Sequence, residues 1–337
     1  MAQLPDIATP VVRWQATHGR NHLPWQRTRD PYRVWLSEIM LQQTQVATVL
    51  DYYPRFLARF PDVAALAAAP VDDVLALWSG LGYYSRARNL HRCAQQVMEL
   101  HGGAFPRTAE VLATLPGIGR STAGAIAAFC FAERSPILDA NVRRVLTRVL
   151  GFGADLAVAR NERLLWEQAE ALLPREHLHD AMPRYTQGLM DLGAAVCVPR
   201  NPRCGECPLA LQCAARRAGD AERYPVRTRK LKRSAESWWL LLRRNAAGAF
   251  WLERRPATGI WAGLYCPPVL AEAPCVEGAQ HLEPFTHVLT HRDLHLHPVI
   301  VQEDGEGEGW YGPAQWPELG LPAPIRKLLE RMGQSLF

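Results

Sequence analysis

The stretch TAEVLATLPGIGRSTAGAIAAFCF, residues 108–131, decides the fold predicted for this chain. Apolar residues recur at helical spacing on both sides of residues 115–119, Leu-Pro-Gly-Ile-Gly, which predicts two short helices joined by a tight turn. Gly117 and Gly119 would let a phosphate oxygen approach the backbone without meeting a Cβ atom. The second helix is expected to begin near Ser121, so its free N–H groups and its dipole would face the same point. The pattern predicts a helical hairpin that can anchor a nucleic acid backbone, although Pro-Gly turns between helices also occur without a ligand.

Outward from this hairpin, residues 1 to about 215 are predicted to be helical. Apolar residues at spacings of three and four recur between Pro and Gly breaks. The segments with this pattern are Val34–Leu50, Val63–Leu66, Val74–Leu77, Ala87–Leu100, Ala109–Leu115, Thr122–Phe131 and Val142–Leu150. Asp139 precedes the last segment at the position of a helix N-cap.

The composition changes after the helical region. Residues 218–237, AGDAERYPVRTRKLKRSAES, are polar and basic and predict an interdomain linker. Beyond it, short apolar runs at Trp238–Leu242 and Ala249–Leu252 and an alternation through residues 294–300 predict strands. A last helix is expected to begin near Pro324. The fold class predicted is an all-α body followed by a smaller α+β domain.

Size and charge set broad limits on function. A chain of 337 residues is long enough for two domains, and 48% hydrophobic residues argue against disorder. No apolar run reaches the length of a membrane span, and the first ten residues do not resemble a secretory signal, so a cytoplasmic protein is expected. The net charge of +5 is modest. Basic residues nevertheless cluster at residues 86–92, 143–144 and 223–233, which is compatible with nucleic acid binding or with solvated helix faces.

Four of the eight cysteines lie within one short loop. Their spacing is C-x6-C-x2-C-x5-C, formed by Cys197, Cys204, Cys207 and Cys213. In a cytosolic chain such crowding favours a metal site over disulfides. Four thiolates can bind tetrahedral zinc or a [4Fe–4S] cluster. Zinc ribbons usually present two C-x2-C knuckles and this loop has one, which favours the cluster.

The hairpin together with the cysteine loop resembles the helix–hairpin–helix DNA glycosylase superfamily. In that superfamily an aspartate follows the hairpin by about twenty residues, and one branch carries a [4Fe–4S] loop with this cysteine spacing. Here the aspartate is Asp139. The stretches WLSEIMLQQTQV (35–46) and GLGYYSRARNL (80–90) closely resemble the MutY-type adenine glycosylases, and the resemblance is continuous over about residues 10–215. It is weaker over the last hundred residues, where GIWAGLYCPP (259–268) is similar to the start of the family's Nudix-like domain.

The residues themselves support an acid at Glu38. Cleavage of an N-glycosidic bond requires protonation of the leaving base and stabilisation of an oxocarbenium-like sugar, and two carboxylates can do both. Glu38 stands among apolar residues, with Trp35 and Gln42 at helical spacing on the same predicted face. Burial would raise its pKa so that it holds a proton near neutral pH. A solvated surface glutamate is the alternative that this context disfavours.

The family resemblance assigns further roles. It implies that Glu38 protonates N7 of an extruded adenine, and that an ionised Asp139 stabilises the cation or attacks C1′ while also capping its helix. It also implies that Asn141 orients a carboxylate or the attacking water. Relatives of the endonuclease III type carry a lysine just after the hairpin, which forms a Schiff base and cuts the strand. This chain has Ser121 there, which implies base removal without an efficient lyase step.

The target base must leave the duplex before a carboxylate can reach it. By resemblance, Gln42 and Tyr83 fill or wedge the base stack, with Leu81 nearby. The remaining expected DNA contacts are Gln43, Thr44, Gly117, Gly119 and Ser121, with Arg86, Arg88 and Arg143 as further phosphate contacts. Core packing is the alternative for Tyr83. The cysteine loop is expected to present Arg200 and Arg203 to phosphate.

The C-terminal domain of the family reads 8-oxoguanine with a Phe-Ser-His loop. The best match in this chain is Leu289-Thr290-His291, so Thr290 and His291 are the expected contacts and Leu289 is a departure from the pattern. The glutamates after Gly263 do not have the R-E-x-x-E-E spacing of a Nudix catalytic helix. Pyrophosphohydrolase activity is therefore not expected.

The sequence thus predicts three parts. Residues 1–217 form the catalytic helical region, with a six-helix domain at about 30–135 and an iron–sulfur domain made by the N-terminal helix and residues 136–217. Residues 218–236 form the basic linker, and residues 237–337 form the Nudix-like domain. The expected protein is a monomer that acts on double-stranded DNA containing adenine opposite 8-oxoguanine or guanine. The alternatives are a glycosylase-lyase for oxidised pyrimidines and a non-catalytic DNA-binding module.

Overall fold

The predicted hairpin forms in a computed structural model of the chain, which describes residues 4–228 and 232–334. Helix α7 (Ala109–Leu112) ends three residues earlier than expected, and helix α8 (Arg120–Phe131) begins one residue earlier. Thr108 caps α7 by accepting from the Val111 N–H. Gly117 has φ +78°, a left-handed conformation that L side chains rarely adopt, so the turn between the helices depends on glycine there.

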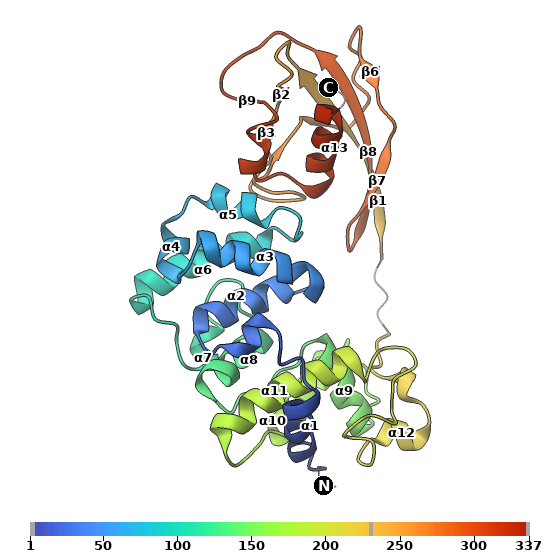
Figure 1. Cartoon of the computed structure of the whole chain (residues 1–337). Coiled ribbons are helices and arrows are strands. Elements are labelled where there is room, and N and C mark those ends of the chain that lie inside the picture. The colour runs from blue at the N-terminus through green and yellow to red at the C-terminus, as the bar shows by residue number, and fades with distance from the viewer. Residues whose placement is uncertain (1–3, 229–231, 335–337) are drawn as a thin grey trace. The chain divides into compact units, whose positions relative to one another are not determined.

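Helices make up most of the first 220 residues (Figure 1). Besides α7 and α8 they are α1 (Ala8–His18), α2 (Pro31–Leu41), α3 (Val46–Arg59), α4 (Val63–Ala68), α5 (Val71–Trp78), α6 (Ser85–His101), α9 (Ala140–Leu150), α10 (Ala159–Ala171), α11 (Leu178–Ala195) and α12 (Ala214–Ala218). In the part of the chain that the structure describes, none of the helices has both the length and the apolar character needed to cross a membrane.

The prediction of a single helix over Val34–Leu50 is wrong. Helix α2 ends at Leu41 and α3 begins at Val46, because Gln42 has an extended backbone and Gln43 is left-handed with φ +55°. An apolar pattern cannot reveal this break, since Ile39 and Val46, at a spacing of i and i+7, stay in phase on either side of it. The break turns Gln42 toward the hairpin, where its Nε2 donates to Thr122 Oγ1 over 3.4 Å.

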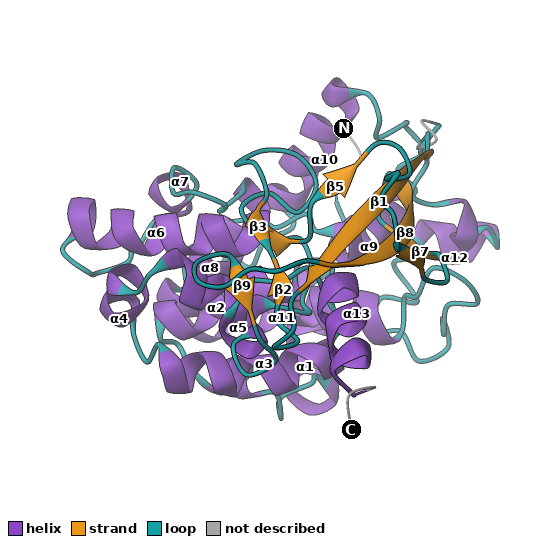
Figure 2. Ribbon diagram, turned by 90° about the horizontal axis from the view of Figure 1, so that it is seen from above, coloured by secondary structure: helices purple, strands orange, loops and turns teal. Residues whose placement is uncertain are grey.

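The C-terminal part of the chain forms a mixed sheet (Figure 2). Its long strands β1 (Ser234–Arg244) and β8 (Arg292–Gln302) pair in parallel along their whole length. The short strands of this sheet are β2 (Phe250–Trp251), β5 (Val269–Leu270), β6 (Gln280–His281), β7 (Phe285–Val288) and β9 (Trp310–Tyr311). Strands β3 (Glu253–Arg254) and β4 (Tyr265–Cys266) form a separate pair, and α13 (Ala323–Gln334) ends the described chain. The all-α body and the following α+β domain are therefore confirmed.

Contacts divide the chain into two compact units that do not follow the chain order. One unit holds residues 1–49 and 93–230, and the other holds residues 50–92 and 231–337. The predicted three-part division keeps residues 50–92 with the helical region, whereas the contacts group them with the sheet. Ion pairing of Arg254 with Asp72 and a 2.6 Å bond from Arg88 Nη1 to the Ala262 carbonyl contribute to that grouping.

The core of the first unit is built around α9. Its residues Val142, Val145, Leu146 and Val149 are buried, as the apolar stripe predicts. The first half of the predicted linker also packs here, because Ala221 and Tyr224 lie against this core and the Val226 carbonyl accepts from the Leu156 N–H. The linker prediction missed this because isolated apolar residues such as Tyr224 and Val226 give no periodic signal. Strand β1 likewise begins inside the predicted linker, at Ser234.

Candidate active site

Glu38 lies in the last turn of α2, between the buried residues Ser37 and Ile39. Its helix is fixed by Asp30 at the N-cap, which accepts from the Arg33 N–H over 3.1 Å. The Glu38 side chain is half-buried and borders two cavities. Burial and the nearby charge of Asp139 raise its pKa to about 8, so the carboxyl group holds a proton at neutral pH.

Asp139 is the N-cap of α9, as expected. A single oxygen, Oδ1, accepts from the Asn141 N–H at 2.7 Å and the Val142 N–H at 2.8 Å. Burial raises the pKa of Asp139, while these two N–H groups and the neighbouring guanidinium groups of Arg144 and Arg143 act in the opposite direction. These hydrogen bonds favour the charged form of the Asp139 carboxylate. Glu38 is then the group that carries the proton.

One cavity brings the two carboxyl groups together with four of the other expected site residues. Of these, Asn141, Ser121, Gln42 and Thr44 lie in its wall, and Arg20, Trp25 and Gln187 are wall residues that the sequence did not suggest. Trp25 belongs to a short 3-10 turn and Arg20 follows the end of α1, so no helical periodicity marks either residue. Gln187 lies in the middle of α11 and has no sequence feature that distinguishes it from a solvent-facing amide.

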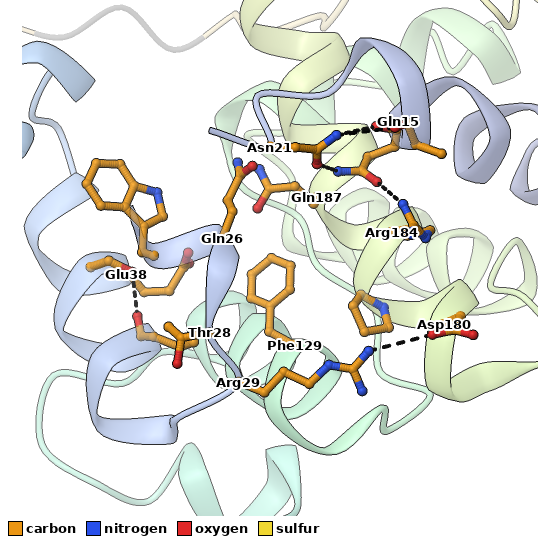
Figure 3. Close-up of a pocket in the computed structure, with 15 residues that line it drawn as sticks. Gln15, Asn21, Gln26, Thr28, Arg29, Glu38, Phe129, Asp180, Arg184 and Gln187 are labelled. Atoms are coloured by element: carbon orange, nitrogen blue, oxygen red, sulfur yellow. Dashed lines mark hydrogen bonds and ion pairs between the residues drawn. The ribbon is translucent and has the colours of Figure 1, made fainter. Parts of the chain in front are cut away.

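A second cavity lies on the other side of Glu38 and shares Trp25 and Gln187 with the first. Figure 3 shows Glu38, Gln187 and Phe129 facing this space from different parts of the fold. Arg29 crosses toward Asp180, with which it forms an ion pair of 3.7 Å. Glu38 therefore lines both cavities.

Trp35, predicted on the same helix face as Glu38, is fully buried and packs on Phe105 and Tyr32, and it lines neither cavity. Trp25 takes the place expected for it at the side of Glu38.

Ser121 and Asn141 support the Asp139 loop. Ser121 Oγ accepts from the Leu138 N–H over 3.1 Å, one residue before Asp139. The Asn141 side chain is held in turn by Arg144, whose Nη2 donates to Asn141 Oδ1 at 2.8 Å and to the Gly193 carbonyl at 2.6 Å. Asn141 thus contacts Asp139 through its backbone, while its amide is tied to α11.

The four predicted cysteine ligands surround a small apolar recess behind α9. Burial raises the pKa of the Cys207 thiol, and the charges of the other three thiols act in the same direction. Within residues 4–228 and 232–334, however, no three His, Cys, Asp or Glu side chains converge tightly enough for a single metal ion. Four thiolates that line one recess are a ligand set that a [4Fe–4S] cluster takes.

Helix α9 also holds this cysteine loop. Arg144 Nε donates to the Cys197 carbonyl at 2.8 Å, and Arg148 donates to the Val198 carbonyl at 2.7 Å and the Pro199 carbonyl at 2.9 Å. Arg148 is 2% exposed, and its guanidinium donates to carbonyl groups of this loop and to Cys197 Sγ. The same helix thus carries Asp139 at one end and the support of the cluster loop along its length.

In the other unit, the expected wedge and the expected 8-oxoguanine loop meet. Tyr83 is 44% exposed with a left-handed backbone, and its hydroxyl contacts the Thr290 hydroxyl. Leu81 is buried. Thr290 and His291 are exposed at the turn between β7 and β8.

The three arginines expected to contact phosphate also have partners within the protein. Arg86 is 8% exposed and donates to the carbonyls of Leu81 and Gly82, so it fixes the wedge loop. Arg88 donates to Ala262, and Arg143 forms an ion pair of 2.6 Å with Glu162. Basic clusters in a sequence do not reveal such partners, which are distant along the chain.

The two arginines of the cysteine loop differ in their contacts. Arg203 contacts the Ala195 carbonyl and Glu206 but stays 56% exposed, and Arg200 is exposed. Both therefore remain available for the predicted phosphate contact.

Comparison with known proteins places each part of the chain. Residues 36–170 match the HhH-GPD superfamily of base excision DNA repair proteins, residues 197–213 the iron–sulfur binding domain of endonuclease III, and residues 238–331 the NUDIX domain. An adenine DNA glycosylase of Buchnera aphidicola (subsp. Acyrthosiphon pisum) is 35% identical, with 97% of each chain covered. The Homo sapiens adenine DNA glycosylase is 42% identical over 66% of this chain and 41% of its own length. A solved thermostable thymine-DNA glycosylase matches with a TM-score of 0.56 and 30% identity, covering 63% of this chain and 95% of that one.

Proposed function

Because this chain belongs to the adenine DNA glycosylases, within the HhH-GPD superfamily of base excision DNA repair proteins, we propose that its substrate is adenine opposite 8-oxoguanine or guanine. The single observation that carries the chemistry is the shared cavity of a protonated Glu38 and a hydrogen-bonded Asp139. The protein hydrolyses the N-glycosidic bond of the base as a monomer and does not cut the strand efficiently.

The two carboxyl groups divide the reaction. Glu38 donates its proton to N7 of the extruded adenine, so the electrons of the C1′–N9 bond leave with a neutral base. The Asp139 carboxylate stabilises the positive charge that develops on the sugar. Water then adds to C1′, and its proton returns to the Glu38 carboxylate, which restores the starting state.

Several neighbouring residues position the base or the Asp139 carboxylate and take no part in bond cleavage. Gln187 and Trp25 border the space beside Glu38, where a planar base fits between an aromatic ring and an amide. Ser121 holds the Asp139 loop through Leu138 and offers no amine for a Schiff base. Asn141 fixes Asp139 through its backbone N–H.

The remaining roles follow the predicted three-part division of the chain. The hairpin residues Gly117 and Gly119, with Gln42, Gln43 and Thr44, hold the duplex, and Leu81 and Tyr83 enter the base stack. Thr290 and His291 read the base opposite adenine. A [4Fe–4S] cluster bound by Cys197, Cys204, Cys207 and Cys213 contributes structure to the loop that carries Arg200 and Arg203.

One experiment separates this function from its alternatives. The protein is incubated with a duplex that contains adenine opposite 8-oxoguanine, and half of the sample is then treated with alkali. Strand scission only after alkali is expected. Scission without alkali would instead indicate a glycosylase-lyase, and no scission under either condition would indicate a binding module. Replacement Glu38→Gln should abolish base release and leave duplex binding intact, and an active variant would exclude Glu38 as the acid.

A further inference from the structure

A cavity of about 560 Å³ lies in the sheet unit, between β7 and α13. It is separate from the active site, because it shares no lining residue with the two cavities there. The charged, imidazole and aromatic side chains that line it are Phe285 and His287 from β7 and Lys327, Glu330 and Arg331 from α13. Two cations against one carboxylate give this cavity a net charge of +1 when the imidazole is neutral. An anion is therefore the ligand that its charge favours.

Ring contacts fix the β7 side of the cavity. Trp261 is 8% exposed, and its ring lies 5.9 Å from the His287 ring. The Arg331 guanidinium lies over the Phe285 ring at 5.9 Å. Burial lowers the pKa of His287, and the charge of Lys327 acts in the same direction. The imidazole is therefore neutral at pH 7 and keeps one N–H group as a donor.

Lys327 has no carboxylate partner in the part of the chain that the structure describes. Glu330 follows it at i+3 and lines the same cavity without forming an ion pair with it. Side chains four residues apart on a helix are neighbours, so Lys327 and Arg331 can approach two oxygens of one anion. Phosphate groups are the anions that lysine and arginine bind together in proteins.

Strand β7 connects this cavity to the loop that we propose reads the base opposite adenine. Val288 ends the strand and is 64% exposed, and Thr290 follows two residues later. His287 and Thr290 are three residues apart, a separation of at most about 10 Å along an extended chain. One nucleotide occupies about 3.4 Å of the duplex axis. The cavity is thus within reach of phosphates up to about three nucleotides from the opposite base.

We propose that this cavity binds a backbone phosphate of the DNA strand that carries the opposite base, through Lys327 and Arg331, with the His287 N–H as a further donor. A contact of this kind reads no sequence, but it fixes the position of a protein on the duplex. The inference rests on the proposed reading of the opposite base by Thr290 and His291. It gives α13 a direct contact with DNA.

The first test measures the affinity of the full-length protein for DNA at several salt concentrations. The duplex carries tetrahydrofuran, an abasic analogue without a base to release, opposite 8-oxoguanine. One lost phosphate contact lowers the slope of log Kd against log salt by about 0.9, which is about an eightfold loss of affinity at 0.1 M salt. Lys327→Ala should show both changes, and Lys327→Arg should show neither. An unchanged salt slope in Lys327→Ala would overturn the proposal.

A carboxylate of the same cavity provides a test of opposite sign. Glu330→Gln removes a negative charge beside the phosphate and should tighten duplex binding about twofold. Glu318→Gln is the matched control, because Glu318 is exposed in the same unit and does not line the cavity, and its affinity should stay at the wild-type value. Equal affinities of the two variants would contradict an anion in this cavity.

Neutral methylphosphonates, placed at one phosphate at a time, locate the contact. At one position in the 8-oxoguanine strand, within about three nucleotides of the lesion, the substitution should weaken wild-type binding about eightfold and have no further effect on Lys327→Ala. Losses that add to that of Lys327→Ala at every position would overturn the proposal. Binding of inorganic phosphate that depends on Lys327, with duplex affinity independent of it, would also overturn it. Because these assays involve no hydrolysis, adenine release together with an unchanged salt slope contradicts this inference alone and leaves the proposed function standing.

Discussion

At the scale of single residues, the protonation of Glu38 dominates the chemistry. Its acid role requires the protonated form, and its pKa is raised to about 8. We expect the single-turnover rate of adenine release to be level around pH 7 and to fall about tenfold per pH unit above pH 8. The rate should also fall at low pH, as Asp139 becomes protonated, because a neutral carboxyl group no longer stabilises the sugar cation. A rate that rises continuously to pH 10 would contradict the assignment of Glu38 as the acid.

The same raised pKa affects the stability of the fold. Between about pH 4.5 and pH 8 the folded protein binds this proton more tightly than the unfolded chain does, so its contribution to stability is lost as the pH rises. Ionising Glu38 in its folded environment costs on the order of 4 kcal/mol. Glu38→Gln, which does not titrate, should therefore be more stable than wild type, by a margin that grows from pH 5 to pH 8 and then stays constant.

Unfolding in urea at several pH values measures this margin on the DNA-free protein. Asp180→Asn is a suitable control, because Asp180 is exposed and its substitution should give a difference that does not grow with pH. A constant margin for Glu38→Gln would mean that burial does not raise the pKa of Glu38.

The sequence located both carboxyl groups but not the residues around them. Glu38 stands out because an acid among Leu36, Ile39 and Met40 is unusual, and Asp139 because it occupies a helix N-cap. Trp25, Arg20 and Gln187 come together only through tertiary packing of a 3-10 turn, a helix end and α11. Local patterns carry no information about such packing, and for that reason Trp35 was expected where Trp25 lies.

At the scale of elements, the two glycines of the hairpin differ in role. Gly117 is needed for the conformation of the turn, and Gly119 for the approach of a phosphate. Gly117 is left-handed, whereas Gly119 has an ordinary backbone and a Cβ atom added to it would meet no other atom within 4 Å. Gly117→Ala should lower the free energy of unfolding by about 1 kcal/mol and weaken duplex binding as a consequence. Gly119→Ala should leave the free energy of unfolding nearly unchanged but weaken duplex binding, because its methyl group would enter the space of a phosphate.

Thermal unfolding and duplex titration on both variants test this difference. Gly153→Ala, in the turn after α9, is a matched control, since a Cβ atom there also meets nothing. Unchanged duplex affinity in Gly119→Ala would show that the hairpin does not hold the backbone at this point.

Element boundaries were less predictable than element types. The helices at α8 and α9 were predicted within two residues because caps and glycine breaks mark their ends. The break between α2 and α3 was missed because it depends on a left-handed Gln43, a conformation for which glutamine has no special preference.

At the scale of the whole molecule, residues far apart in the chain hold the segment that contains Tyr83, the proposed wedge. Ser79 Oγ and the Tyr84 hydroxyl both donate to the Leu321 carbonyl, on either side of the wedge residue Tyr83. Arg326 in α13 donates to Ser79 Oγ over 3.0 Å. A pattern read along the chain assigns residues 79–84 to the helical region, yet the sheet unit fixes their conformation.

Arg233, where the linker reaches the sheet, fixes the other loop of this arrangement. Its guanidinium donates to the Leu289 carbonyl at 3.0 Å and the Thr290 carbonyl at 3.4 Å, and it pairs with Asp293. Three contacts from one side chain hold the loop that contacts Tyr83 through Thr290. Arg233→Ala should therefore slow adenine release opposite 8-oxoguanine several-fold, because the reading loop loses its support, and leave release opposite guanine nearly unchanged.

The comparison of the two mispairs is what makes this prediction specific. Arg292→Ala is the matched control, because Arg292 lies on the same strand as Asp293 but its guanidinium pairs with Glu236 at 2.8 Å, and the substitution keeps the backbone carbonyl that accepts from the Leu289 N–H. It should change neither rate. If Arg233→Ala slows both mispairs equally, Arg233 contributes to the fold and not to the choice of the opposite base. If Arg233→Ala changes only the rate opposite 8-oxoguanine, the end of the linker contributes to recognition of the opposite base, because Arg233 sets the position of Thr290.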